Sequence, residues 1–184
     1  FHGRQQLTAN KVVGTIMSNY ALEQTLKERG IEFLRASVGD RYVLEMMKQS
    51  GSRLGGEPSG HVILLDSHTA GDGILTAVKL AEVLVRNGAT LDELAAGFHP
   101  YPQVLDGLKV RKKIPLEIPE IAGLIQDAEK RFGESGRLVI RYSGTEPLLR
   151  IMAEGPDSTR VKSVVSELKA NLEDLIAELS NGNG

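Results

Sequence analysis

Apolar and polar residues follow two different rhythms along this chain. In its first part, short apolar runs alternate with segments that repeat apolar residues at steps of three and four, as buried strands separated by helices do. The strands are expected at residues 12–17, 31–36 and 61–66, and the helices at 20–29, 41–49 and 74–86. This alternation predicts an α/β domain, an α/β/α sandwich with a largely parallel or mixed sheet.

The second part groups its strands and helices differently. We expect a strand at residues 104–113, a helix at 119–132, two strands on either side of a polar turn at 141–147, and a last helix at 158–179. Strands joined by a short turn, with helices segregated from them, are typical of an α+β domain. The pattern predicts an antiparallel sheet with flanking helices.

Single residues predict where the helices begin and how they are buried. Asn19 and Asp40 precede helical segments and can accept hydrogen bonds from the free N–H groups there. Asp157 or Ser158 can cap the last helix in the same way. The helix at 74–86 is apolar over a broad face, which predicts that it is well buried.

A cluster of glycine and proline at residues 97–102 marks the boundary between the two parts. The predicted domains are residues 1–98 and 99–184. The chain begins at Phe1 rather than at methionine, so we expect it to be a piece of a longer protein.

Composition narrows the classes of function. The 184 residues have a formal net charge of −2 and no cysteine, and no apolar run is long enough to span a bilayer. Near-neutral charge argues against a nucleic-acid or membrane partner, and the lack of thiols excludes disulfides and cysteine chemistry. These features fit a cytoplasmic protein.

The polar turn between the last two strands concentrates groups that bind anions. Arg141 and Arg150 carry planar cationic forks suited to phosphate. Ser143 and Thr145 add hydroxyl donors, and Gly144 lets successive N–H groups point into one concavity. The turn is either a phosphate-binding loop or an ordinary hairpin turn whose arginines are solvated.

A second polar cluster, Glu57, Ser59 and His61, lies between two apolar segments. If the chain is extended here, the alternation places the three side chains on one side. A carboxylate and a hydroxyl can hold two sugar hydroxyls, but a tight turn with local hydrogen bonds explains them equally well. A nucleophilic Ser/His/Glu site is a third interpretation, which lacks a strained elbow and an oxyanion partner in the sequence.

Other charged residues have simpler interpretations. Arg41 follows the expected cap and is either solvated or directed at a ligand, and the basic run at 109–113 is read as a solvated strand edge rather than a nucleic-acid site. Asp66 and Asp72 have no third ligand at a recognisable spacing, so we expect no metal site.

Four motifs stand in a fixed order along the chain. They are Val-Gly-Asp-Arg-Tyr at 38–42, Gly-Glu-Pro-Ser-Gly-His at 56–61, Thr-Ala-Gly-Asp-Gly at 69–73 and Arg-Tyr-Ser-Gly-Thr-Glu-Pro-Leu-Leu-Arg at 141–150. Together they resemble the alpha-D-phosphohexomutase superfamily and, within it, the bacterial phosphoglucosamine mutases.

The resemblance implies two recognition sites and no catalytic nucleophile in this chain. The phosphate group of the substrate is expected to be held by Arg141, Ser143, Gly144, Thr145 and Arg150. Hydroxyls of the hexose are expected at Glu57 and Ser59. By the same resemblance, His61 is expected to lie beside the substrate and assist proton transfer, and Arg41 is expected to orient the phosphosugar.

Members of the superfamily have four domains, and this chain resembles the third and fourth, its C-terminal half. Two of the superfamily's loops do not occur in the sequence: the Ser-His-Asn loop, whose serine carries the exchanged phosphoryl group, and the Asp-Gly-Asp-x-Asp-Arg loop that binds Mg²⁺. The resemblance therefore implies Mg²⁺ on the N-terminal half of the full-length enzyme and no cofactor on this chain.

For the full-length enzyme, the resemblance implies an isomerase that interconverts glucosamine 6-phosphate and glucosamine 1-phosphate through a bisphosphate intermediate and a phosphoserine. The expected partners are the glucosamine phosphates and the N-terminal domains, and this piece alone is expected to be inactive. Two alternatives remain: a phosphomannomutase or phosphoglucomutase, and a sugar-phosphate-binding module without catalysis.

Overall fold

The computed structural model describes residues 7 and 9–181. These residues divide into two compact units, one ending at Pro100 and the other beginning at Tyr101. The outer ends of the predicted domains, residues 1 and 184, lie outside the described residues.

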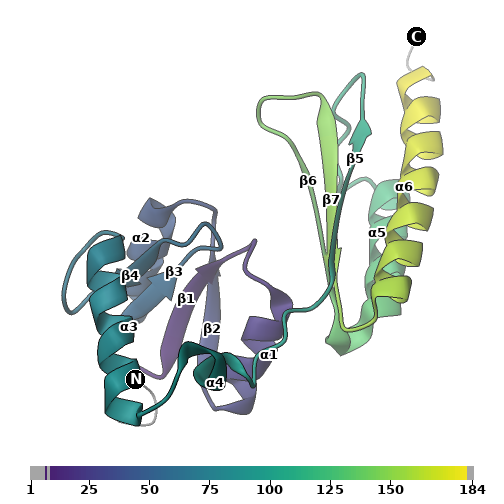
Figure 1. The fold of residues 1–184 in the computed structure, drawn as a ribbon. Coiled ribbons are helices and arrows are strands. Elements are labelled where there is room, and N and C mark those ends of the chain that lie inside the picture. Colours follow the sequence, from purple (N-terminus) through teal and green to yellow (C-terminus); the bar gives the residue numbers. More distant parts are fainter. Residues whose placement is uncertain (1–6, 8, 182–184) are drawn as a thin grey trace. The chain divides into compact units, whose positions relative to one another are not determined.

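The first unit is built around a four-stranded mixed sheet (Figure 1). Its elements are β1 (Lys11–Thr15), α1 (Tyr20–Glu28), β2 (Glu32–Ala36), α2 (Asp40–Ser50), β3 (Leu54–Gly56), β4 (Val62–Leu64), α3 (Gly73–Asn87) and α4 (Leu91–Ala95). The strand order is β2-β1-β3-β4, with β1 parallel to β2 and β3, and β3 antiparallel to β4. The predicted α/β class with a mixed sheet is confirmed.

Short apolar runs bury the centre of this sheet. The core contains Val13, Ala36 and Ile63 from the strands and Val43 and Met47 from α2. A Cβ on Gly55 would lie 2.5 Å from the sulfur of Met47, so this position in β3 leaves room only for glycine against α2. The strands expected from the sequence do not include β3, because glycine has a low strand propensity and two of its three residues are glycines.

The predicted caps of this unit are correct in one case and wrong in the other. Asn19 accepts a hydrogen bond from the N–H of Ala21 at 3.0 Å and caps α1. Asp40 does not cap α2: the N-cap is Gly39, whose carbonyl accepts the N–H of Val43 at 3.2 Å, so Asp40 is the first helical residue. Its carboxylate accepts the N–H of its neighbour Arg41 at 2.7 Å instead.

The expectation that the helix at 74–86 is well buried is wrong. α3 is present, and Asp72 caps it by accepting the N–H of Leu75 at 3.0 Å, but none of its residues is buried. Ile74 and Val85 are 80% and 82% exposed. Apolar periodicity locates the face of a helix that prefers burial, but it does not supply an element to cover that face.

The second unit is a three-stranded antiparallel sheet with two helices on one face (Figure 1). Its elements are β5 (Gln103–Lys109), α5 (Pro119–Phe132), the 3₁₀ turn η2 (Gly133–Ser135), β6 (Arg137–Tyr142), β7 (Leu148–Glu154) and α6 (Ser158–Asn181). The order is β5-β7-β6, and both pairings are antiparallel. This confirms the predicted α+β arrangement.

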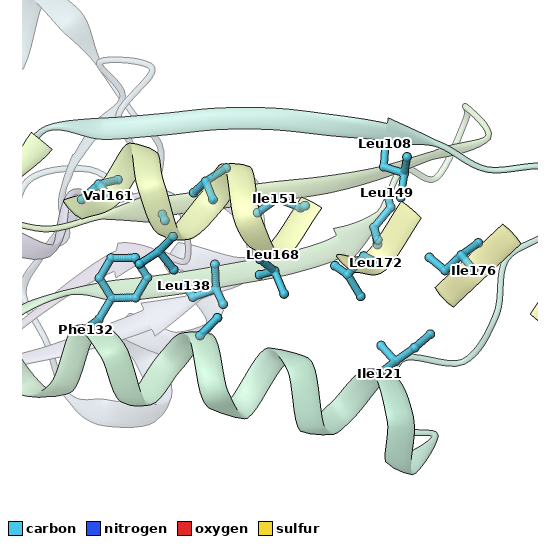
Figure 2. Close-up of a cluster of buried hydrophobic side chains, with 14 of the residues drawn as sticks. Leu108, Ile121, Phe132, Leu138, Leu149, Ile151, Val161, Leu168, Leu172 and Ile176 are labelled. Carbon is cyan, nitrogen blue, oxygen red and sulfur yellow. The ribbon is translucent and has the colours of Figure 1, made fainter. Parts of the chain in front are cut away.

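The helices cover this sheet through a continuous apolar core (Figure 2). α6 begins where predicted, with the Asp157 carboxylate accepting the N–H groups of Thr159 and Arg160 at 2.9 and 3.1 Å. Its inward residues step by three and four, as an amphipathic helix requires. They pack against the alternate residues of β6 and β7 that point the same way, and the buried members of α6 are Val161, Val164, Val165, Leu168, Leu172 and Ile176.

The strand expected at 104–113 ends early, at Lys109. The N–H of Val110 still bonds to the carbonyl of Pro147 at 3.0 Å, but Pro147 has no N–H to return, so the ladder stops there. The basic residues at 111–113 therefore lie on a loop beside the β6–β7 turn and not on a strand edge.

Candidate functional site

The turn between β6 and β7 is closed by backbone hydrogen bonds. Beyond the last strand pair, Tyr142 with Leu149, the N–H of Ser143 donates to the carbonyl of Leu148 at 2.8 Å. The N–H of Leu148 then donates to the carbonyl of Glu146 at 2.8 Å. These bonds hold residues 143–147 at the tip of the hairpin. The turn predicted at 141–147 is therefore present but begins two residues later, because Arg141 and Tyr142 still pair in β6.

Arg141 and Arg150 lie directly opposite each other on β6 and β7. Strand alternation points both away from the face that packs on the helices, and both are exposed. The Glu146 carboxylate accepts a 2.8 Å bond from the guanidinium of Arg150, whereas Arg141 has no ion-pair partner among the described residues. Like charges opposite each other on a sheet repel, so an anion between them would be favoured.

Two backbone donors of the turn are available. The N–H groups of Gly144 and Thr145 have no acceptor within the described part of the chain, and both residues are exposed. Ser143, by contrast, is 4% exposed, and its hydroxyl accepts the N–H of Glu146 at 3.3 Å. In this conformation Ser143 braces the turn, and Gly144 and Thr145 present its free donors.

Two residues outside the predicted sites, Lys113 and Tyr142, stabilise this turn, although Lys113 was expected to be part of a solvated edge. The Lys113 ammonium donates to the carbonyl of Ser143 at 2.7 Å and lies 6.0 Å from the centre of the Tyr142 ring. The Tyr142 hydroxyl accepts the N–H of Ile114 at 3.1 Å and donates to its carbonyl at 2.8 Å. Burial raises the pKa of that hydroxyl, the bonds to Ile114 oppose the rise, and the charge of Glu117 adds to it.

The second predicted cluster lies on the hairpin of β3 and β4, and its chain is not extended. The N–H of Gly60 donates to the carbonyl of Glu57 at 3.0 Å, and the N–H of Glu57 donates to the carbonyl of His61 at 2.9 Å. These bonds make a tight turn with Gly60 at φ 96°, a conformation that favours glycine. The alternation expected of Glu57, Ser59 and His61 therefore does not apply, because the intervening backbone reverses.

Tertiary contacts bring Glu57 and His61 together instead. The Glu57 carboxylate is 9% exposed; one oxygen accepts the N–H of Gly39 at 2.8 Å, and the other lies 3.6 Å from Nδ1 of His61. The His61 side chain is 60% exposed, and a Cβ on Gly71 would lie 3.5–3.6 Å from it. Ser59 is exposed at the tip of the turn.

The bond from Gly39 links the first motif to the second. Arg41 lies two residues after Gly39, is exposed, and has no ion-pair partner among the described residues. A carboxylate has about four acceptor positions, so Glu57 keeps capacity for further donors after binding Gly39. Sequence spacing could not reveal this link, because 18 residues separate its ends.

Two other features are absent from residues 7 and 9–181. No group of three or more His, Asp or Glu side chains there is arranged to hold a metal ion. No helix in the same residues is both long and apolar enough to cross a bilayer.

Comparison with known families decides the assignment of the chain. Residues 1–101 match the model of phosphoglucomutase/phosphomannomutase, alpha/beta/alpha domain III, and residues 80–171 match the C-terminal domain of the same family. The chain belongs to the phosphoglucomutase/phosphomannomutase family. The superfamily resemblance expected from the four motifs is thereby confirmed.

Curated relatives in this family carry one recurring name. The chain is 47% identical over 173 residues to the phosphoglucosamine mutase of Syntrophomonas wolfei and 44% identical over 171 residues to that of Rhizobium etli. The matches cover 94% and 93% of this chain. The chain spans 38% of the length of each of these relatives, and the matching domain models are those of its C-terminal part.

Solved structures share the fold at low sequence identity. N-acetylphosphoglucosamine mutase of Aspergillus fumigatus, in complex with GlcNAc-6P and magnesium, aligns with a TM-score of 0.65 at 18% identity, over 89% of this chain and 38% of its own. A phosphoglucomutase/phosphomannomutase family protein of Burkholderia thailandensis aligns at 0.64 and 20% identity, over 89% and 37%.

Proposed function

We propose that this chain is the substrate-recognising C-terminal part of a phosphoglucosamine mutase. The observation that carries the proposal is the 47% identity to a phosphoglucosamine mutase over 94% of the chain, which includes both candidate loops. The full-length enzyme would interconvert glucosamine 6-phosphate and glucosamine 1-phosphate.

The β6–β7 turn is proposed to bind the phosphate of the substrate. Arg141 supplies an unpaired guanidinium, and Gly144 and Thr145 supply free N–H groups. Arg150 can turn from Glu146 to the anion, because that ion pair is exposed and therefore weak. Ser143 contributes its hydroxyl once a phosphate oxygen competes for it.

The β3–β4 turn is proposed to bind the hexose. Glu57 is held by Gly39 and can accept hydrogen bonds from sugar hydroxyls, and Ser59 can donate or accept one. His61, at 3.6 Å from Glu57, is a suitable group to assist proton transfer, and Arg41 is proposed to orient the phosphosugar.

The remaining chemistry is assigned to the N-terminal part of the full-length enzyme. Phosphoryl transfer needs an in-line nucleophile and neutralisation of charge, which the superfamily's phosphoserine and Mg²⁺ loops would supply there. This chain would hold the substrate while the phosphoryl group moves through a bisphosphate intermediate, and alone it would bind without turnover. We propose a cytoplasmic location for the full-length enzyme, which the lack of cysteine in the 184 residues of this chain fits.

An NMR titration of the 184-residue chain with glucosamine 6-phosphate tests the proposal. We expect saturable shifts of the Gly144 and Thr145 amides, with affinity reduced about tenfold or more in Arg141→Ala, because a charge-assisted hydrogen bond is lost. Arg160→Ala removes an exposed arginine at the start of α6 and should bind as the wild type does. Equal binding by the two variants would contradict the phosphate site.

The phosphoglucomutase/phosphomannomutase name of the family model supports a second candidate, an enzyme acting on glucose or mannose phosphates. Titrations with glucose 6-phosphate and mannose 6-phosphate separate the two. Preference for either over glucosamine 6-phosphate, with shifts that include Glu57 and Ser59, would favour the second candidate.

A further inference from the structure

A hollow of about 290 Å³ lies between the β6–β7 turn and the loop that follows β5. One wall consists of residues 144–147, which carry the free N–H groups of Gly144 and Thr145. The opposite wall contains Val110, Arg111 and Lys113. The basic run that the sequence presented as a solvated edge thus contributes two cations to a concave surface beside the proposed phosphate loop.

The charge of this hollow is positive. Arg111 and Lys113 both line it, and Arg111 has no ion-pair partner among the described residues. Glu146 also lines the hollow, but its carboxylate is engaged by Arg150 at 2.8 Å. An anion entering here would meet two cations and two free N–H donors, with the one carboxylate already neutralised.

The basic wall is anchored to the turn. The Tyr142 hydroxyl accepts one hydrogen bond from the backbone of Ile114 and donates another to it, and this fixes the chain next to Lys113. The Lys113 ammonium uses one of its three N–H groups to donate a hydrogen bond to the carbonyl of Ser143. Ser143 directly precedes Gly144 and Thr145, whose N–H groups are free within the described residues. Lys113 lines the hollow, and its other two donors have no acceptor among the described residues.

We infer that the loop after β5 forms the second wall of the phosphate site, with Arg111 as a direct ligand of the anion and Lys113 as a positioning residue for the turn. This inference rests on the proposed function, which it extends by two residues on a loop outside the four motifs. Arg111 contributes a guanidinium to the bound phosphate. Lys113 holds the carbonyl of Ser143 and so fixes the peptide plane that also carries the N–H of Gly144.

Titration of the 184-residue chain with inorganic phosphate, followed at the Gly144 and Thr145 amides, tests Arg111. Arg111→Met should weaken binding about tenfold, because it removes a charge-assisted hydrogen bond while keeping the apolar stem. Lys112→Met is the matched control: it removes the same charge from the neighbouring exposed residue, which does not line the hollow. Equal affinities of the two variants would overturn the role of Arg111.

The role of Lys113 has a signature that does not need the ligand. In the anion-free chain, Lys113→Met should shift and broaden the amides of Gly144 and Thr145 and speed their hydrogen exchange, while the α6 amides stay unchanged and report an intact fold. Lys113→Arg, which can still donate to the Ser143 carbonyl, should restore the amide positions. Unchanged turn amides in Lys113→Met would overturn the positioning role.

Arg141→Ala separates this inference from the proposal beneath it. If phosphate binding depends on Arg141 but Arg111→Met and Lys112→Met bind phosphate with equal affinity, the proposed phosphate loop is supported and the role of the second wall is contradicted. If the wild-type chain shows no saturable shifts with phosphate or with glucosamine 6-phosphate, the phosphate site and its second wall both fall.

Discussion

The two units bury their helices to very different degrees. The core of the second unit contains fifteen buried apolar residues, six of them from α6, whereas the sheet–α2 core of the first contains five and none from α3. Both helices carry apolar residues at steps of three and four. The two helices differ in the elements that face them. α6 packs on β5, β7 and α5, whereas the main contact of α3 within the described residues is with the short strand β4 at the edge of the sheet.

This contrast separates two kinds of apolar surface. In the second unit, burial of apolar side chains accounts for the fold within the described residues. In the first unit, exposed apolar residues of α3 such as Ile74 and Val85 add nothing to the free energy of unfolding, since their side chains remain in contact with water. The two candidate turns are thus supported unequally: the β6–β7 turn rests on the larger core, and the β3–β4 turn rests on the smaller one.

The largest expected effect comes from a matched pair of leucines. Leu172→Ala in α6 removes a fully buried side chain and should lower the free energy of unfolding of the second unit by about 2–5 kcal/mol. Leu80→Ala in α3 removes a side chain that is already substantially exposed and should cost less than about 1 kcal/mol. Urea unfolding, followed through the NMR peaks of each unit separately, measures both changes in unfolding free energy. Equal losses in the two variants would contradict the difference in helix burial between the units.

A smaller effect is expected from the Tyr142 hydroxyl, which ties the loop after β5 to the closed core. Tyr142→Phe should lower the stability of the second unit by about 1 kcal/mol, because the backbone groups of Ile114 lose their partner. Tyr42→Phe, at an exposed tyrosine in the first unit, should change nothing.

The same hydroxyl predicts an alkaline dependence. The folded-state pKa of Tyr142 is raised, chiefly by burial, so its contribution is complete below its unfolded pKa of about 10 and is lost as pH rises through the higher folded pKa. Between pH 9 and 12, the free energy of unfolding should therefore fall more steeply with pH in the wild type than in Tyr142→Phe. Parallel curves for the two proteins would contradict this assignment.

The sequence predicted features that depend on local chemistry. Helix α5 was expected at its observed bounds, and the Asp157 cap and the inward face of α6 follow from side-chain type and spacing alone. The expected position of the β6–β7 turn was correct for the same reason, since two alternating strands leave only one place for it.

Features that depend on distant partners could not be predicted. The carboxylate of Glu57 meets the N–H of Gly39, and Lys113 meets the carbonyl of Ser143, only after strands and helices have packed. The end of β5 depends on Pro147, a residue 38 positions beyond Lys109. Pro147 lies opposite Val110, just beyond the last strand pair, Lys109 with Leu148. Local propensity describes each segment and does not state which other segment it will meet.

A weaker interaction, on the edge strand β5 of the second unit, tests whether ion pairs outside the core add to the free energy of unfolding. Asp106 on β5 accepts a 2.9 Å bond from Lys169 on α6, and this bond, with the N–H of Gly107, lowers the pKa of the Asp106 carboxyl. Asp106→Asn should cost about 0.5 kcal/mol at pH 7, because the pair is partly exposed. Asp127→Asn, from a fully solvated pair with Lys130, is the control and should cost nothing.

Acid sharpens the Asp106 prediction. A lowered folded-state pKa means that the stabilisation is present above the unfolded pKa of about 3.9 and is lost as pH falls through the lower folded value. The difference between Asp106→Asn and the wild type should thus vanish in strongly acidic solution. A difference that persists there would indicate a packing effect of the substitution rather than the ion pair.

The smallest effect is expected on the outward face of α3. Val85→Thr exchanges one methyl group for a hydroxyl at a side chain that is 82% exposed, so the unfolding free energy of the first unit should change by less than about 0.5 kcal/mol. Amide hydrogen exchange along α3 measures this change at several protein concentrations. A loss well above that value would mean that an occupant covers this face in solution. If the loss also grew with protein concentration, the occupant would be a second copy of the chain, and the contrast between the units would then describe the monomer alone.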